Sequence, residues 1–567
     1  MHDLLIAGGT VVDGTGAPPR RADVAVSDGH VAAVGQGLGP AAATLDAEGC
    51  LVTPGWIDPH THYDAQATWD DELSPSGWHG VTTAVLGNCG VGFAPARPDR
   101  RAWLVGLMEG VEDIPGEVLS AGLHWGWETF GEYLDVLDRL PRTLDVAAQL
   151  PHGAVRAYAM GERGARNERA TPADIEQMAG LVREGLLAGG VGFTTSRTPV
   201  HRAADGEPVP GTYAEPDELL GIGAALPASD AGVLGVTTDF DDEERELGWM
   251  VELARLSGRP VTFSLVQRDD DPEQWRRLLA AAETANREGA RLVPQVAGRP
   301  TGILMGLEGT VHPFFRNRAY LELAPLPLPE RVRRMRDPDV RQRILDEPLP
   351  RGATARLYAT AFDKLFRLGD PPDYEPPPGA SVAAMAEREG RPPAAVAYDL
   401  LLGREGRELL YFPLLGYGDG DMESIRTMLL DGRTVLGLAD GGAHCGFVCD
   451  ASQPTFMLTH WARDRTRGPR LPLELVVRML TADPADLYGM ADRGRLEPGL
   501  RADVNVVDLD RLALHPPEMV HDLPGGGRRL VQRASGYRAT LVRGVRTYED
   551  GQPTSARPGR LLRQAAA

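Results

Sequence analysis

The chain of 567 residues predicts an α/β fold: a TIM-like (β/α)8 barrel with a small β-sandwich built from both termini. In the middle of the chain, short apolar stretches alternate with helical patterns, which is typical of a parallel α/β sheet. Both ends instead alternate apolar and polar residues between Gly-containing turns, which indicates antiparallel strands. The predicted domains are the sandwich parts, 1–54 and 486–567, and a barrel at 55–485 with an inserted subdomain at about 300–430.

The two sandwich parts have matching patterns. Residues 4–50 are punctuated by the turn pairs Gly8-Gly9 and Asp28-Gly29, and a similar pattern returns at 501–550 with Asp550-Gly551. Termini of a domain often lie close together in space. We therefore expect the first and last strands of the chain to fold as one unit.

The barrel prediction depends on eight apolar strand candidates. They lie near 51–58, 81–88, 144–151, 190–195, 232–238, 260–266, 291–297 and 434–439. Eight strand–helix units favour a closed barrel over an open sheet. In such barrels the chemistry is found where the strands end, so these ends are the places to search for functional residues.

The first strand ends in a pair of histidines. His60 and His62 follow the apolar run of residues 51–57 and are separated by one residue, so in an extended segment both imidazoles point to the same side. Two solvated histidines in a turn are the alternative. Two converging neutral imidazoles at a strand end provide half of a divalent-metal site.

Two further strand ends complete the predicted metal site. Cys89 closes the second strand in a glycine-flanked turn, where it is either a small buried residue or a thiolate that binds one ion or bridges two. Asp440 ends the eighth strand, where it is predicted to be both a metal ligand and the general base for an activated water. Three protein ligands with an open position are the catalytic arrangement for zinc, which His60, His62 and Asp440 (or Cys89) provide, and we expect one Zn²⁺ rather than two.

The other candidate catalytic and substrate-binding residues each have two possible interpretations. His152, at the third strand end, is a donor or acid toward a substrate carbonyl, or else a structural cap of the strand. Arg197 and His201, after the fourth strand, contact an anionic substrate group or belong to a solvated loop. Trp125 lines a substrate pocket or packs in the core. His444 orients the substrate or its own loop.

Composition narrows the class of protein. A net charge of −21 argues against a nucleic-acid or anionic-membrane partner, so a small-molecule substrate is expected. Four scattered cysteines and no signal-like segment in residues 1–30 predict a cytoplasmic protein with no membrane anchor. Lys364 is the only lysine, which disfavours a carboxylated-lysine metal bridge and a Schiff base.

A long Pro/Arg-rich stretch follows the seventh strand. It contains a charged helical segment at 330–347 and a predicted helix at 391–404. An insertion at this point of a barrel most naturally forms a subdomain or a lid over the barrel mouth. The other interpretation is a contact surface in a homo-oligomer.

Several motifs together resemble one enzyme family. They are Val52–His62, Gly87–Gly90, Trp125–Leu134, Ala439–His444 and Arg557–Leu561. They are similar to motifs of the amidohydrolase superfamily, in the branch of D-aminoacylases and other N-acyl-D-amino-acid deacylases. The resemblance implies a metal-binding histidine on each of the fifth and sixth strands. Thr237 and Leu265 occupy those positions here, and Gln267 stands where those enzymes often carry a lysine that pairs with the substrate carboxylate.

The expected function is therefore metal-dependent hydrolysis of a C–N bond in an amide or cyclic amide, most similar to N-acyl-D-amino-acid deacylation. Asp440 is the predicted base, and His152 is a second predicted catalytic residue. The substitutions at Thr237 and Leu265 keep two alternatives open. One is a repurposed lyase, cyclase or isomerase in which the metal serves only as a Lewis acid. The other is a non-catalytic binding protein.

Overall fold

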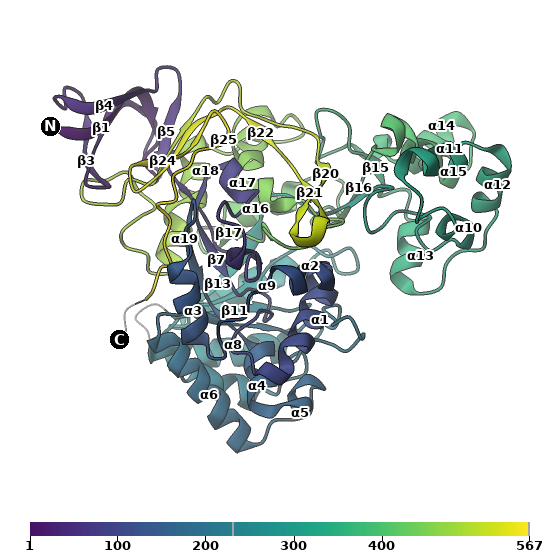
Figure 1. Ribbon diagram of the computed structural model, residues 1–567, viewed down its shortest axis with the longest axis horizontal. Coiled ribbons are helices and arrows are strands. Elements are labelled where there is room, and N and C mark those ends of the chain that lie inside the picture. The colour runs from purple at the N-terminus through teal and green to yellow at the C-terminus, as the bar shows by residue number, and fades with distance from the viewer. Residues whose placement is uncertain (229–231, 565–567) are drawn as a thin grey trace.

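Strands from the two ends of the chain share one sheet in the computed structural model, which describes residues 1–228 and 232–564 (Figure 1). Val52 lies opposite Val506 where the antiparallel strands β5 and β18 pair, and Ile6, Val24 and Leu541 are buried in the common core. The predicted joining of the termini is therefore present; the domain boundaries stay predictions. The nine strands are β1 (His2–Val11), β2 (Arg20–Ser27), β3 (His30–Gly35), β4 (Ala41–Asp46), β5 (Leu51–Pro54), β18 (Val504–Val507), β23 (Tyr537–Val542), β24 (Val545–Glu549) and β25 (Gln552–Pro553).

The middle of the chain forms parallel strands that pair in chain order. They are β6 (Trp56–Asp58), β7 (Val81–Leu86), β8 (Asp145–Ala148), β9 (Leu150–Pro151), β10 (Gly192–Ser196), β11 (Val233–Thr237), β12 (Val261–Ser264), β13 (Leu292–Ala297) and β17 (Val435–Gly437). Gln149 separates β8 from β9, so the predicted third strand is present in two pieces. The last strand returns to the first: the Asp440 N–H donates to the His60 carbonyl at 3.1 Å, and the His62 N–H donates to the Gly441 carbonyl at 2.7 Å. This is the strand order expected around a barrel.

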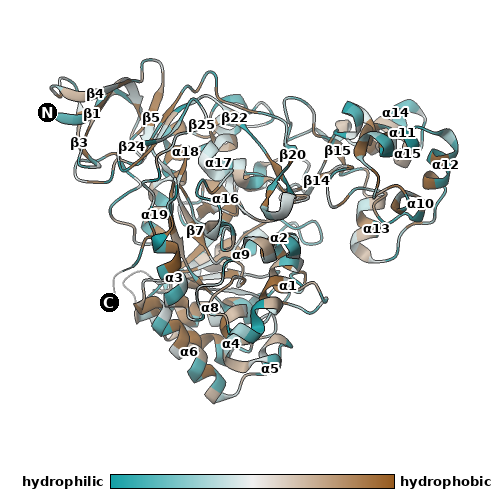
Figure 2. Ribbon diagram, in the orientation of Figure 1, coloured by the Kyte–Doolittle hydropathy of each residue, from teal (hydrophilic) through white to brown (hydrophobic). Residues whose placement is uncertain are grey.

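Helices surround these strands (Figure 1). Those that follow the parallel strands include α4 (His152–Met160), α6 (Pro172–Leu187), α7 (Pro216–Gly223), α8 (Glu243–Ser257), α9 (Gln274–Arg287), α16 (Glu423–Leu429), α18 (Leu473–Leu480) and α19 (Ala482–Leu487). In Figure 2 the strands are largely apolar, whereas the helices carry both apolar and polar residues, as an outer layer should. The α/β class is therefore confirmed.

The excursion between β7 and β8 contributes three helices that reach the strand ends. They are α1 (Arg101–Glu112), α2 (Gly116–Gly122) and α3 (Phe130–Arg139). A capping box starts α3, because the Thr129 side chain accepts from the Glu132 N–H while the Glu132 carboxylate accepts from the Thr129 N–H. The last residue of α1, Glu112, is fully buried. This excursion brings one carboxylate to the barrel mouth.

The insertion forms a helical lobe beside the barrel (Figure 1). Its elements are β14 (Thr301–Met305), α10 (Arg318–Leu321), α11 (Leu328–Met335), α12 (Pro338–Leu345), α13 (Ala353–Thr360), β15 (Phe366–Arg367), α14 (Val382–Glu389), α15 (Pro393–Leu401) and β16 (Leu410–Leu415). The lobe has an apolar core of its own, which includes Met335 and Tyr398. It touches the end of the sixth strand at two places: Gln267 donates to Asp419 at 2.7 Å, and Lys364 pairs with Asp269.

Within residues 1–228 and 232–564, none of the helices combines the length and apolar character needed to cross a lipid bilayer.

Candidate functional site

The ends of three parallel strands bring together four side chains of the types that can bind a metal. One ligand atom each of His60, His62 and Cys89 lies within 4.8 Å of the other two. Asp440 Oδ1 is 3.3 Å from His60 Nε2 and 3.6 Å from His62 Nε2. The predicted convergence of these residues is therefore present as geometry; their role as ligands remains a prediction.

The outer nitrogens of both imidazoles face oxygen atoms. His60 Nδ1–H donates to Gln295 Oε1 at 2.8 Å. His62 Nδ1 lies 3.3 Å from Glu112 Oε1. In metal sites, an oxygen behind the imidazole fixes its tautomer and orientation. Both rings consequently present Nε2 to the space they share with Cys89 and Asp440.

The charges around the site favour a cation. Burial raises the pKa of the Cys89 thiol, but the adjacent His60 imidazole outweighs this effect and lowers the pKa to about 5. Burial likewise disfavours the charged form of Asp440, yet the hydrogen bond with His62 and the charge of His60 hold the pKa of Asp440 below its ordinary value. The Thr237 hydroxyl donates to Cys89 Sγ at 3.4 Å, which further favours the thiolate. A thiolate and a carboxylate therefore each lie 3.3 Å from His60 Nε2 in a buried site.

The backbone that carries these groups is strained. Cys89 and Asp440 have φ values of 53° and 48°, in the left-handed region that non-glycine residues rarely adopt. Next to Cys89, Gly90 has φ 69°, and a Cβ atom there would lie 2.7 Å from the Ser196 nitrogen. Only glycine fits that position of the turn. Such strain is concentrated at functional sites, where the surrounding structure maintains it.

The donors present fit one divalent ion of borderline softness. Two imidazole nitrogens, a thiolate and a carboxylate are the ligand types that zinc accepts. Neither Leu265 nor Thr237 adds a donor for a second ion, because the Leu265 side chain is apolar and fully buried and the Thr237 hydroxyl is bonded to Cys89. The cavity beside them, lined by His60, Cys89 and Thr237, has a volume of about 10 Å³. That is room for about one water molecule.

His152 lies in a buried ion-pair network and not among the four donors. Its Nδ1 bonds to Thr195 Oγ1 at 2.9 Å and its Nε2 to Glu218 Oε1 at 3.1 Å. Arg156 Nε donates to the same carboxylate at 2.8 Å. Burial lowers the pKa of His152 and keeps the imidazole neutral. Both ring nitrogens are thus engaged within the protein.

The three predicted substrate contacts in the loops also have protein partners. Arg197 Nε pairs with Glu246 at 2.6 Å, inside the fold. His201 Nδ1 bonds to Ser196 Oγ at 3.0 Å on a half-buried loop. Trp125 packs against Trp127 with ring centroids 5.1 Å apart and the ring planes tilted by 43°. In the part of the chain that the structure describes, none of the contacts found for these residues reaches the four donors.

His444 lies behind the metal-binding group. Its Nε2 is 3.6 Å from Glu112 Oε2, and its side chain is 21% exposed. Glu112 and Gln295 are therefore site residues that the sequence analysis missed. Gln295 offered a signal, because it is a polar residue inside an apolar strand. Glu112 offered none, since it lies in an acidic segment that looks solvated.

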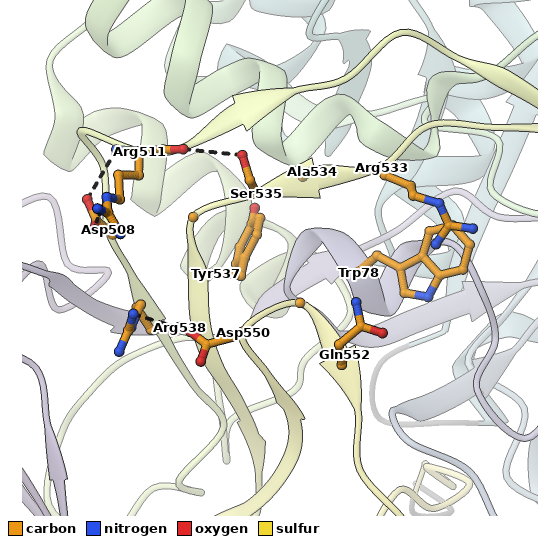
Figure 3. A pocket seen from close by; sticks show the side chains of 12 residues that line it. Trp78, Asp508, Arg511, Arg533, Ala534, Ser535, Tyr537, Arg538, Asp550 and Gln552 are labelled. Atoms are coloured by element: carbon orange, nitrogen blue, oxygen red, sulfur yellow. Dashed lines mark hydrogen bonds and ion pairs between the residues drawn. The ribbon is translucent and has the colours of Figure 1, made fainter.

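A surface groove lies elsewhere, on the C-terminal strands (Figure 3). It has a volume of about 350 Å³ and is lined by Trp78, Arg533 and Tyr537, among others. Its arginines already have partners: Arg533 lies over the Trp78 ring at 4.7 Å and pairs with Glu518. The groove shares no lining residue with the four donors.

Comparisons with known proteins agree with this geometry. A model of the amidohydrolase family matches residues 43–548. The D-aminoacylase of Alcaligenes xylosoxydans xylosoxydans is 26% identical over 573 residues, covering 100% of this chain and 98% of that protein. The N-acyl-D-glutamate deacylase of the same organism is 27% identical, covering 100% and 97%. The crystal structure of N-acyl-D-glutamate deacylase from Bordetella bronchiseptica, complexed with zinc and a phosphonate inhibitor, is 25% identical, with a TM-score of 0.66 and coverage of 99% of both chains.

The motif resemblance is thereby confirmed over nearly the whole chain. The structural neighbour also supports the amidohydrolase type of fold. This chain is a hydrolase of carbon–nitrogen bonds other than peptide bonds, and it belongs to the amidohydrolase family, in the branch that contains the D-aminoacylases.

Proposed function

We propose that this chain is a zinc-dependent deacylase of N-acyl-D-amino acids, built on a (β/α)8 barrel and working with one metal ion. One observation carries the proposal: His60, His62, Cys89 and Asp440 converge at the strand ends with their metal-binding atoms facing one another. The substrate class follows from the relatives, which are a D-aminoacylase and an N-acyl-D-glutamate deacylase.

His60, His62 and either Asp440 or Cys89 would hold the ion, which leaves one position open. When bound, zinc supplies Lewis acidity, which activates a water molecule and polarises the amide carbonyl. Asp440 is the general base: its carboxylate stays charged and accepts a proton from the attacking water. The same carboxylate returns that proton to the leaving nitrogen, so one water is consumed and an acid and an amine are released.

Neighbouring residues orient the side chains of this site. Gln295 and Glu112 hold the two imidazoles from behind, and Thr237 stabilises the Cys89 thiolate. For His152 we favour the structural role, because Thr195 and Glu218 engage both of its ring nitrogens. Arg197 likewise stabilises the fold through Glu246.

Two measurements test the proposal together. Elemental analysis of the purified protein should find one zinc per chain, and a panel of N-acetyl-D- and N-acetyl-L-amino acids should show hydrolysis of D-substrates only. His60→Ala should lose both zinc and activity. His30→Ala is the matched control, because it removes an exposed histidine on the N-terminal sheet and should change neither. Full activity in His60→Ala would exclude the proposed chemistry.

The delivery of water is a separate test of the proposal. Turnover in ¹⁸O-labelled water should place one labelled oxygen in the product acid, because hydrolysis consumes one water for each bond broken. A product acid without the label would contradict the proposed chemistry.

A further inference from the structure

Three buried polar atoms without a hydrogen-bond partner gather behind the metal-binding group. In the described part of the chain, His62 Nδ1, Glu112 Oε2 and His444 Nδ1 all lack such a partner. Buried polar atoms are normally satisfied, so each exception requires an explanation. Three exceptions on three adjacent residues indicate a shared role.

Glu112 lies between the two histidines. Its Oε1 is 3.3 Å from His62 Nδ1, and its Oε2 is 3.6 Å from His444 Nε2. The Glu112 side chain is only 1% exposed. Asp440 approaches the other nitrogen of His62, Nε2, at 3.6 Å. Glu112 therefore contacts the far side of the imidazole and does not join the four donors.

The end of α1 is held so that this carboxylate points inward. The backbone N–H of His444 donates to the Glu112 carbonyl. The next residue, Asp113, accepts from Thr310 Oγ1 at 2.9 Å and from the Gly446 N–H at 3.0 Å. Asp113 also has φ 52°, a strained conformation that terminates the helix. Three contacts from two segments, residue 310 and residues 444–446, thus determine where Glu112 lies.

We propose that Glu112 is a positioning residue for His62, with His444 as the partner that makes its burial tolerable. A neutral imidazole carries its proton on either nitrogen. A carboxylate 3.3 Å from Nδ1 favours the tautomer that is protonated at Nδ1 and leaves the Nε2 lone pair free for the ion. Burying a carboxylate is unfavourable, and the polar His444 ring, with Nε2 3.6 Å from the other oxygen, offsets part of this cost through an electrostatic contact longer than a hydrogen bond. The inference rests on the proposed metal-dependent function.

Metal affinity is the direct measurement. Zinc dissociation constants are obtained by competition with a chelator of known affinity, for the parent and for Glu112→Gln, which keeps the size of the side chain and removes its charge. Loss of such a partner weakens metal binding by about 10–100-fold. The cobalt-substituted variant should also show a shifted visible spectrum, because the orientation of His62 changes the ligand field.

Glu375→Gln is the matched control. Glu375 is also a buried carboxylate facing an imidazole, with Oε2 at 3.0 Å from His460 Nε2, and it contacts none of the four donors through any described interaction. We expect it to lower stability without changing the zinc dissociation constant. His444→Asn, at a partly exposed position, provides a second variant if Glu112→Gln does not fold, and it should weaken zinc binding by a smaller factor.

The outcomes separate the two proposals. If the parent binds one zinc and both variants bind it equally tightly with an unchanged cobalt spectrum, the role of Glu112 is wrong and the metal-dependent function stands. If the parent binds no zinc, the proposed function itself is wrong and this inference with it. Weaker binding in both variants, with Glu375→Gln unchanged, supports the assignment.

Discussion

Two buried histidine groups at strand ends differ in one respect: whether their polar atoms are satisfied. At the third strand end, Thr195 and Glu218 engage both ring nitrogens of His152. At the first strand end, the rings of His60 and His62 turn Nε2 toward a thiolate and a carboxylate, and atoms around them lack hydrogen-bond partners. Both groups are equally deep in the protein.

The comparison shows that burial alone does not distinguish a structural histidine from a functional one. The group around His152 is a closed ion-pair network, which accounts for every ring nitrogen within the fold. The group around His60 brings a thiol and a carboxylate against the Nε2 atoms of two imidazoles, an arrangement that a cation or a proton completes. The four predictions below would break or sharpen this contrast.

The largest expected effect is on catalysis. Asp440→Asn keeps the shape of the side chain and removes the base, and kcat should fall by about 10²–10⁴-fold. Steady-state kinetics on zinc-loaded enzyme measure it. Asp508→Asn, which changes a carboxylate in the groove of Figure 3, is the control and should leave kcat unchanged. An unaltered kcat in Asp440→Asn would contradict the role of this residue.

The next largest effect is on the stability that the buried network of His152, Arg156 and Glu218 provides. Glu218→Gln leaves the buried Arg156 without its anionic partner, which should lower the free energy of unfolding by about 3–5 kcal/mol. Urea denaturation measures it, with zinc content expected to remain at the parent level. Glu215→Gln, at a half-exposed pair with Arg245, should change stability by less than about 1 kcal/mol.

The contacts of Glu218 also predict how the free energy of unfolding depends on pH. Burial acts to raise the pKa of Glu218, but the hydrogen bond from His152 dominates and lowers the pKa to about 2. An unfolded glutamate has a pKa of about 4.3. The unfolded state therefore binds more protons in acid, so the stabilisation is complete above pH ~4.3 and is lost as the pH falls toward ~2. The gap between parent and Glu218→Gln should shrink over that range; a constant gap would argue against a charged Glu218.

The smallest effect is on the thiolate. Thr237→Val removes the hydroxyl that donates to Cys89 Sγ, and the loss of one such bond should raise the zinc dissociation constant by about two- to tenfold. Chelator competition measures this change. Thr238→Val is the neighbouring control. The Thr238 hydroxyl accepts a hydrogen bond from the Phe240 N–H, and no described contact joins it to Cys89. Equal effects of the two substitutions would show that the bond to sulfur is unimportant.

The strand positions and the four donors were predictable from the sequence, because apolar runs and the residues at their ends are local signals. The predicted strand 291–297, for example, corresponds to β13 (Leu292–Ala297). Partners far apart in the sequence were not predictable. Glu218 follows His152 by 66 positions, and only the fold shows that the two meet. Glu112 looks solvated in sequence and becomes buried only because the 444–446 loop packs on it.

The insertion is placed differently from the simplest expectation. A lid would cover the barrel mouth, whereas Figure 1 shows the lobe standing to one side with its own core. The base of the lobe contacts the residues that follow the sixth strand: Asp419 and the Gly416 and Gly418 N–H groups bond to Gln267, and Lys364 pairs with Asp269. A role in closing the site or in contacts between copies of the chain stays a prediction.

The pairing of β5 with β18 has a consequence for biosynthesis. One edge of β5 pairs with β18, which the ribosome synthesises about 450 residues later. At about 5–20 residues per second, this delay is roughly 20–90 s. During that interval the nascent N-terminal strands present an open hydrogen-bonding edge and half of an apolar core. Chaperone binding to this short segment, before translation ends, would protect the protein from premature association.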